Sequence, residues 1–154
     1  MSLKLHYEVS NGGWATLGMH HPRGNAVIDV SYLHDSLLDL AKAAIASITT
    51  EELAEVIFVE EPGHVVMEVG PVTGSELPLT VIRYEDWPER EANQAEVVLK
   101  ARIQRDNFVR EVAHLLEDIQ QKLGEPEYSR RWKLAPFPSE VAQRLSGLIH
   151  HMNL

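Results

Sequence analysis

Two hydrophobic periods follow one another along this sequence, and their order constrains the fold more than any other feature. Over residues 3–9, apolar and polar residues alternate, as they do in a half-buried strand. The segment Asn11-Gly12-Gly13 follows and predicts a tight hairpin turn, because asparagine and glycine tolerate positive φ. A return strand is expected over residues 14–21, and after a turn residues 26–30 continue the alternation as a third strand. Three strands joined by short turns form a meander, so they are expected to be antiparallel.

The period then lengthens to three and four residues, which predicts an amphipathic helix over about residues 33–48. Ser31 or Asp35 is expected to cap its start, because both side chains accept hydrogen bonds from free backbone N–H groups. Residues 49–52 resemble a capping box for a second helix. The β-branched and aromatic run after them nevertheless favours a strand over residues 54–60.

Alternating patterns continue in the second half of the chain and are followed by two further helices. Three more strands are expected, over residues 65–69, 77–84 and 96–103. Asp106 is expected to cap the start of a long helix that ends at Gly124 and Pro126, because glycine suits a C-terminal cap and proline cannot continue a helix. Ser139 is expected to cap the start of a closing helix.

These elements predict a single α+β domain over residues 1–154, in the order βββ-α-ββββ-α-α. We expect one antiparallel sheet of six or seven strands, with two or three helices packed on one face. The opposite face is expected to be largely polar, because Lys4, His6 and Glu8 alternate with the apolar residues of the first strand.

The composition excludes several classes of protein. Hydrophobic residues make up 44% of the 154 residues and charged residues 24%, which is typical of globular domains. The chain has no cysteine, which excludes disulfides, thiol catalysis and zinc sites with cysteine ligands, and fits a cytoplasmic location. No apolar run is long enough to cross a bilayer, so no membrane association is expected. A net charge of −9 argues against nucleic-acid binding, which requires neutralised phosphates, and is compatible with a basic protein partner.

The loop between the last two expected strands is the candidate binding site. Trp87 lies there among Glu85, Asp86 and Glu89. Exposed aromatic side chains surrounded by charge are typical anchors of protein-binding surfaces. The alternative is that Trp87 folds over the edge of the sheet, while the carboxylates only keep the loop in contact with water.

The eight histidines are the candidate metal-binding or acid–base groups. His6 and His20 are expected to lie across the first hairpin, where a third ligand would complete a metal site, although solvated surface histidines are the simpler interpretation. Glu60, Glu61 and His64 meet at an expected turn, which suits either an acid–base pair or a solvated hairpin tip. The sequence contains no motif for a nucleophile, a phosphate-binding loop or a clustered ligand set. We therefore assign no catalytic residue, no metal and no cofactor.

Several short segments, in this order, resemble a family of small bacterial proteins that has no assigned activity. The similar segments are residues 30–35, 60–63, 87–88, 128–132 and 136–138. The resemblance implies a bacterial origin and carries over no catalytic residue.

The leading functional hypothesis from the sequence is a non-enzymatic protein-binding domain, similar in role to bacterial immunity proteins. Small size, acidity, absent catalytic motifs and the loop around Trp87 favour this hypothesis. The alternative is a small-ligand- or metal-dependent enzyme that uses the histidines near the first hairpin. A homodimer formed through an exposed sheet edge or face is a third possibility.

Overall fold

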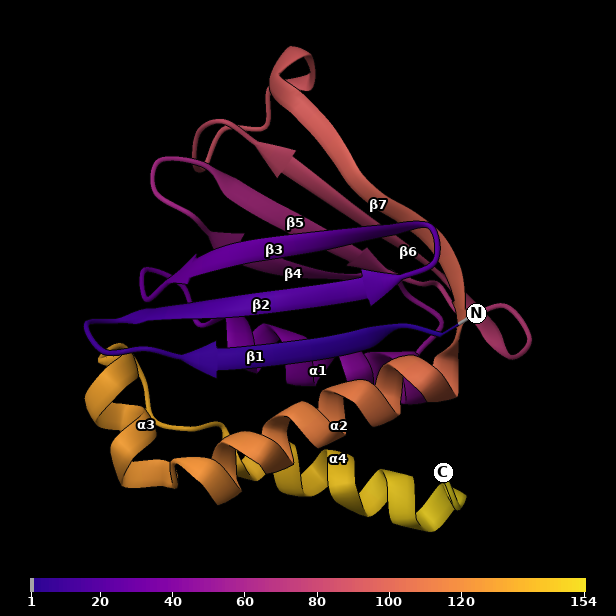
Figure 1. Cartoon of the computed structure of the whole chain (residues 1–154). Coiled ribbons are helices and arrows are strands. Elements are labelled where there is room, and N and C mark those ends of the chain that lie inside the picture. Colours follow the sequence, from indigo (N-terminus) through magenta and orange to yellow (C-terminus); the bar gives the residue numbers. More distant parts are fainter. Residues whose placement is uncertain (1) are drawn as a thin grey trace.

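A computed structural model describes residues 2–154 as an α+β fold with seven strands and four α-helices (Figure 1). The strands are β1 (Lys4–Val9), β2 (Trp14–His21), β3 (Gly24–Ser31), β4 (Ala54–Val59), β5 (His64–Val69), β6 (Glu76–Tyr84) and β7 (Ala95–Gln104). The helices are α1 (Ser36–Thr49), α2 (Arg105–Lys122), α3 (Glu125–Trp132) and α4 (Ser139–Met152), with a short 3₁₀ turn, η1 (Ala92–Gln94), before β7. All seven expected strands are present, and all their pairings are antiparallel.

The prediction of one continuous sheet was wrong, because the strands form two sheets. The first has the order β1-β2-β3 and the second has the order β4-β5-β6-β7. Helix α1 closes the outer edge of β4: Ser36 Oγ donates to the carbonyl of Ile57 at 2.6 Å, and the N–H of Ile57 donates to Asp39 at 3.2 Å. With these backbone groups satisfied by α1, the β4 edge is not free to pair with β3.

The structure also has one more helix than the two or three expected. Gly124, with φ of 77°, ends α2 as predicted, but the chain then turns directly into α3. Pro126 lies in the first turn of α3, where a missing N–H costs no hydrogen bond, so this proline starts a helix rather than only ending one. Helices α1 and α2 pack on the strands, and α4 packs on α1 and α2. In Figure 1, α1 lies behind β1, and the other three helices lie below β1.

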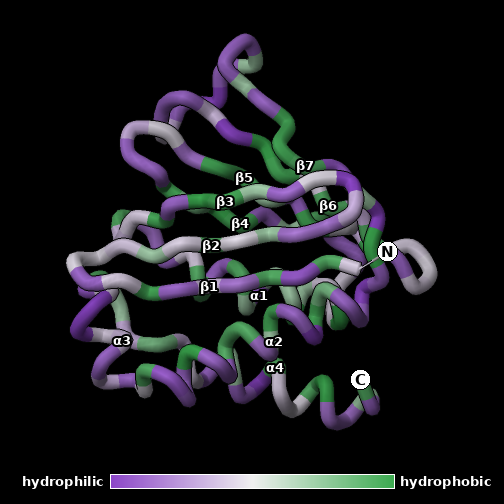
Figure 2. Tube along the Cα trace, viewed as in Figure 1, coloured by the Kyte–Doolittle hydropathy of each residue, from purple (hydrophilic) through white to green (hydrophobic). Residues whose placement is uncertain are grey.

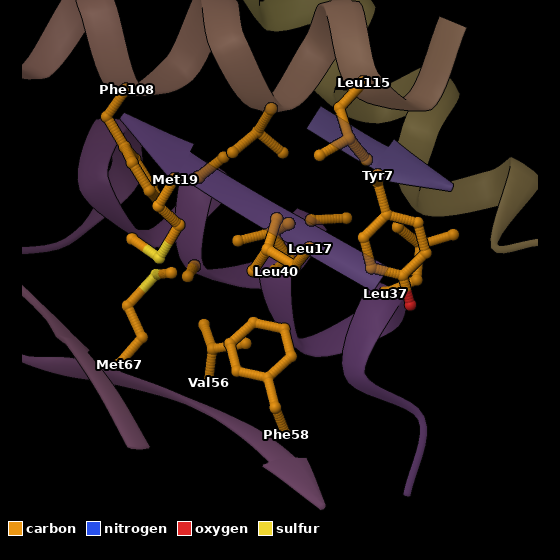
Figure 3. Close-up of a cluster of buried hydrophobic side chains, with 14 of the residues drawn as sticks. Tyr7, Leu17, Met19, Leu37, Leu40, Val56, Phe58, Met67, Phe108 and Leu115 are labelled. Carbon is orange, nitrogen blue, oxygen red and sulfur yellow. The ribbon is translucent and has the colours of Figure 1, made fainter. Parts of the chain in front are cut away.

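The hydrophobic core lies between the two sheets and is closed by the helices. Figure 3 shows Leu17 of β2 facing Phe58 of β4 and Met19 of β2 facing Met67 of β5, with Phe108 of α2 beside Met19. All five side chains are buried. Hydrophobic and hydrophilic residues alternate along α2 in Figure 2, as the periodicity of its sequence predicts.

Helix α2 closes the free edge of β1 with side-chain hydrogen bonds. Asn107 accepts from the N–H of Leu3 at 2.8 Å and donates to its carbonyl at 3.0 Å. Glu111 accepts from the N–H of Leu5 at 2.9 Å. This part of the β1 edge is thereby protected from pairing with another chain.

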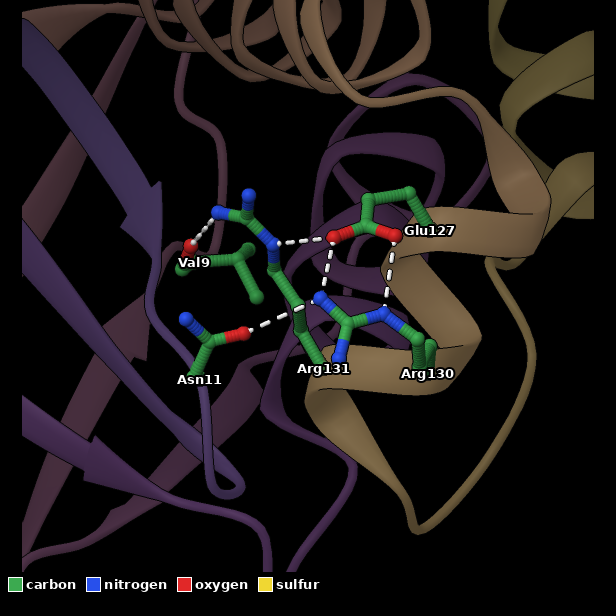
Figure 4. Close-up of polar contacts among 5 residues, drawn as sticks. All are labelled: Val9, Asn11, Glu127, Arg130 and Arg131. Atoms are coloured by element: carbon green, nitrogen blue, oxygen red, sulfur yellow. Dashed lines mark hydrogen bonds and ion pairs between the residues drawn. The ribbon is translucent and has the colours of Figure 1, made fainter.

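Helix α3 is fastened to the first hairpin by a pair of arginines (Figure 4). Arg131 donates to the carbonyl of Val9 at 3.0 Å, and Arg130 donates to Asn11 at 3.2 Å. Both guanidinium groups also donate to Glu127, at 2.8 and 2.6 Å, and these bonds lower the pKa of Glu127 to about 2. The network holds α3 against the end of β1.

The start of α1 carries a titratable pair whose effect on stability is testable. His34 Nε2 donates to Asp39 at 2.7 Å, and this hydrogen bond raises the pKa of His34 above its usual 6.5. The stabilisation of the fold by the pair of His34 with Asp39 is therefore fully present below pH 6.5, and it is lost as the pH rises through the raised pKa of His34. We expect His34→Gln to lower the free energy of unfolding by up to about 1 kcal/mol at pH 5.5 and by less at pH 8.5. Urea unfolding at both pH values measures this difference, and an equal loss at the two values would contradict it.

No helix within residues 2–154 combines the length and apolar character needed to cross a bilayer.

Candidate functional site

Residues 85–91, which join β6 to η1 and β7, lie at the end of the second sheet that points away from the helices (Figure 1). They lie against the turn between β4 and β5. His64 Nδ1 donates to the carbonyl of Asp86 at 2.7 Å, and the His64 ring stacks on Tyr84 with 5.0 Å between ring centroids. His64 is only 1% exposed, so it supports the loop from within instead of lying at a solvated hairpin tip.

Gly63 brings the backbone of the β4–β5 turn into close contact with the start of the loop. A Cβ atom at this position would lie 2.3 Å from the carbonyl oxygen of Tyr84 and 2.9 Å from that of Glu85. Farther along the loop, Arg90 donates to both carboxylate oxygens of Glu55 on β4, at 3.1 and 3.2 Å. The loop is thus fixed to its neighbours at three separate points.

The four residues proposed for binding all lie on this fixed loop. Trp87 is 39% exposed, so part of its ring is covered and part faces solvent. Glu85, Asp86 and Glu89 are exposed. The loop therefore presents an aromatic ring with carboxylates on both sides of it in the sequence.

A hollow of about 540 Å³ lies beside the loop, between the β3 edge and the end of the second sheet. We refer to it as the acidic cleft. Five carboxylates line it, from Asp29, Glu60, Glu61, Glu85 and Glu96. Glu85 is the member shared with the proposed binding loop.

Arg83 is the arginine that lines the acidic cleft, and Glu60 neutralises it. Its Nε and Nη2 atoms donate to the two oxygens of Glu60, both at 2.9 Å, and Nη2 also donates to the carbonyl of Val27 on β3 at 3.2 Å. The bonds to Glu60 raise the pKa of Arg83, which is therefore a permanent cation. Within residues 2–154, the other four cleft carboxylates make no ion pair, so the cleft keeps an excess of negative charge.

Sequence reasoning missed most of this cleft. Asp29 comes from the first sheet and Glu96 from β7, and no local pattern connects them with the turn at residues 60–63. The sequence suggests either an acid–base pair of His64 with Glu60 and Glu61 or a solvated hairpin tip. In the structure Glu60 pairs with Arg83, and His64 bonds a backbone carbonyl.

His6 and His20, the candidate metal ligands of the first hairpin, lie on the outer face of the first sheet. His6 pairs with Gly18 and His20 pairs with Lys4, so the two histidines are diagonal neighbours across β1 and β2. Both side chains are exposed. Within residues 2–154, no group of three or more histidine or carboxylate side chains is placed to hold a metal ion.

Comparison of the chain with protein-family models, with curated proteins and with solved structures finds no match. The geometry of the acidic cleft and of the loop around Trp87 is therefore what bears on function.

Proposed function

We propose that this chain is a non-enzymatic protein-binding domain, similar in role to bacterial immunity proteins, and that a basic partner binds at the acidic cleft and the Trp87 loop. The observation that carries the proposal is the excess of carboxylates without an ion pair in a hollow lined by Glu85, which lies on the same loop as the partly exposed Trp87. Tryptophan is enriched among the residues that contribute most to protein–protein affinity.

The charge of the cleft selects the partner. Asp29, Glu61, Glu85 and Glu96 attract lysine and arginine side chains, and the whole chain has a net charge of −9. Complementary charge accelerates association and disfavours acidic competitors. Because these groups are near solvent, the attraction is expected to weaken as salt is added.

The tethering of the loop favours binding for a second reason. A mobile loop loses conformational freedom when a partner orders it, and this loss weakens affinity. Here the bonds from His64 and Arg90, together with the close contact at Gly63, hold the loop before any partner arrives. The surface around Trp87 is therefore already organised.

The proposal is tested by capturing partners from the native host and comparing variants of the loop. We expect Trp87→Ala, and separately the double charge reversal Glu85→Lys with Asp86→Lys, to lower the affinity for the captured partner at least tenfold. The alanine variant lacks the contact area that the tryptophan ring would bury against the partner, and the two new lysines repel a basic partner. Titration calorimetry with the purified partner measures the effect.

Matched controls separate the surface from general effects of charge and size. The pair Glu117→Lys with Glu140→Lys makes the same charge change on α2 and α4, and Leu134→Ala removes a large apolar side chain that is 47% exposed. These controls are expected to bind as the unmodified chain does. A partner whose affinity falls equally with the controls, or does not change with the loop variants, contradicts the proposal.

A further inference from the structure

Within residues 2–154, β3 pairs with β2 alone, and no strand is hydrogen-bonded to its outer edge, although β4 and β7 pack close to β3. In an antiparallel pair, alternate residues direct their N–H and C=O groups away from the partner strand. The carbonyl of Val27 accepts from Arg83 on the far side from β2, so Asn25, Val27 and Asp29 all direct their backbone groups to this outer edge. Asp29 also lines the acidic cleft, so the edge runs into that hollow.

The open edge of β3 differs from two other edges of this fold. Asn107 and Glu111 bond the edge of β1, and Ser36 and Asp39 bond the edge of β4. On the β3 edge, within residues 2–154, the bond from Arg83 to Val27 is the one hydrogen bond made by a side chain. The Val27 side chain next to it is 63% exposed. Within residues 2–154, the other outward N–H and C=O groups of Asn25, Val27 and Asp29 make no hydrogen bond.

The contacts of Arg83 indicate which side chains would suit a strand that pairs with the outer edge of β3. The Arg83 guanidinium lies between a carboxylate and a strand carbonyl, and it donates to Glu60 and to Val27 at once. A lysine or arginine on a strand beside β3 would find the same two kinds of acceptor, with Asp29, Glu61 and Glu96 as the carboxylates. Arg83 keeps both bonds to Glu60 if an incoming N–H takes the Val27 carbonyl.

We infer that the acidic cleft receives an extended segment of the partner protein, which pairs with β3 as a fourth strand and carries lysine or arginine at alternate positions. Side chains of a strand alternate between its two faces, and Val27 shares one face of β3 with the cleft residue Asp29. One set of alternate residues on the added strand, the lysines or arginines, would therefore lie beside Val27 and Asp29, and the residues between them would point to the opposite face. Strand addition takes affinity from backbone hydrogen bonds and selectivity from alternate side chains. The inference rests on the proposed function and specifies what the partner presents.

A synthetic peptide tests strand addition directly. The probe is the capped heptapeptide Lys-Thr-Lys-Val-Lys-Thr-Lys, compared with two isomers that each carry three backbone N-methyl groups. One isomer carries them on the last three lysines, and the other carries them on the two threonines and the valine. A bound strand directs alternate N–H groups toward β3, so we expect one isomer to lose at least tenfold in affinity and the other to bind as the parent does. Hydrogen exchange of the Val27 amide should slow when the parent peptide is added.

Variants of the protein provide the reciprocal test. Val27→Pro removes an N–H that points away from β2, and edge strands tolerate proline. The affinity of this variant for the parent peptide should therefore be at least tenfold lower than that of the unmodified protein. Val27→Thr keeps the N–H and should bind normally. The comparison of isomers uses the unmodified protein, so it decides the question even if Val27→Pro does not fold.

The outcomes separate this inference from the proposed function. If both isomers bind as the parent does and Val27 exchange does not change, the peptide is held by charge alone; strand addition is then wrong, while a basic partner still fits. If no peptide binds at millimolar concentration, strand addition is also wrong, and the calorimetry with the captured partner decides the proposed function separately.

Discussion

Replacing Trp132 with alanine is expected to lower the free energy of unfolding by about 3–5 kcal/mol. Trp132 is fully buried, and its ring lies 6.4 Å from that of Tyr128, between α3 and the rest of the core. The truncation leaves a cavity and also loosens α3, which holds the end of β1 through Arg131. Urea unfolding followed by circular dichroism measures the loss.

Two controls identify packing as the cause of this loss. Trp87→Ala is the same substitution at an exposed site and is expected to change stability by less than about 1 kcal/mol. Trp132→Phe keeps most of the buried ring, and the indole Nε1 it removes has no hydrogen-bond partner, so this variant should lose much less than alanine. A loss from Trp132→Ala as small as that from Trp87→Ala would show that α3 does not stabilise the core.

Gly63→Ala is expected to destabilise the fold by about 1–3 kcal/mol and to displace the binding loop. The new methyl group would lie 2.3 Å from the Tyr84 carbonyl oxygen, and that oxygen belongs to backbone that cannot rotate away. The turn must therefore separate from the loop, which stretches the bond from His64 to Asp86. We expect thermal unfolding at a lower temperature together with weaker binding of the partner.

Gly147→Ala is the matched control for this substitution. Gly147 lies within α4, and a Cβ atom there has no neighbour within 4 Å. Alanine is the better helix former, so this change should stabilise the chain by up to about 1 kcal/mol. If both glycine variants changed stability in the same direction, the close contact at Gly63 would not explain its effect.

Most elements of this fold could be predicted from the sequence because burial on one face leaves a periodic pattern. The alternation that marks β1 and β7 and the three-and-four spacing of α2 all correspond to buried faces in the structure. The division into two sheets left no such pattern. It depends on lateral contacts of β4 with Ser36 and Asp39, which in the sequence are ordinary polar residues at the start of a helix.

The candidate site could be predicted only where its residues are consecutive. Trp87 and its neighbouring carboxylates form one segment, so the loop was identifiable from the sequence. Asp29 and Glu96 join Glu60 only through the packing of one sheet beside another, and sequence spacing does not encode that packing. His64 gave a misleading signal, because it lies near two glutamates in the sequence, whereas in the structure it is buried and donates to the carbonyl of Asp86.

The closure of the β1 edge by α2 has a consequence for the synthesis of this chain. The bond between Leu3 and Asn107 spans 104 residues, so the first hairpin leaves the ribosome long before its covering helix does. At roughly 5–20 residues per second, the delay is about 5–20 s. During that interval β1 has an open edge, which makes the nascent chain most prone to aggregate before α2 appears.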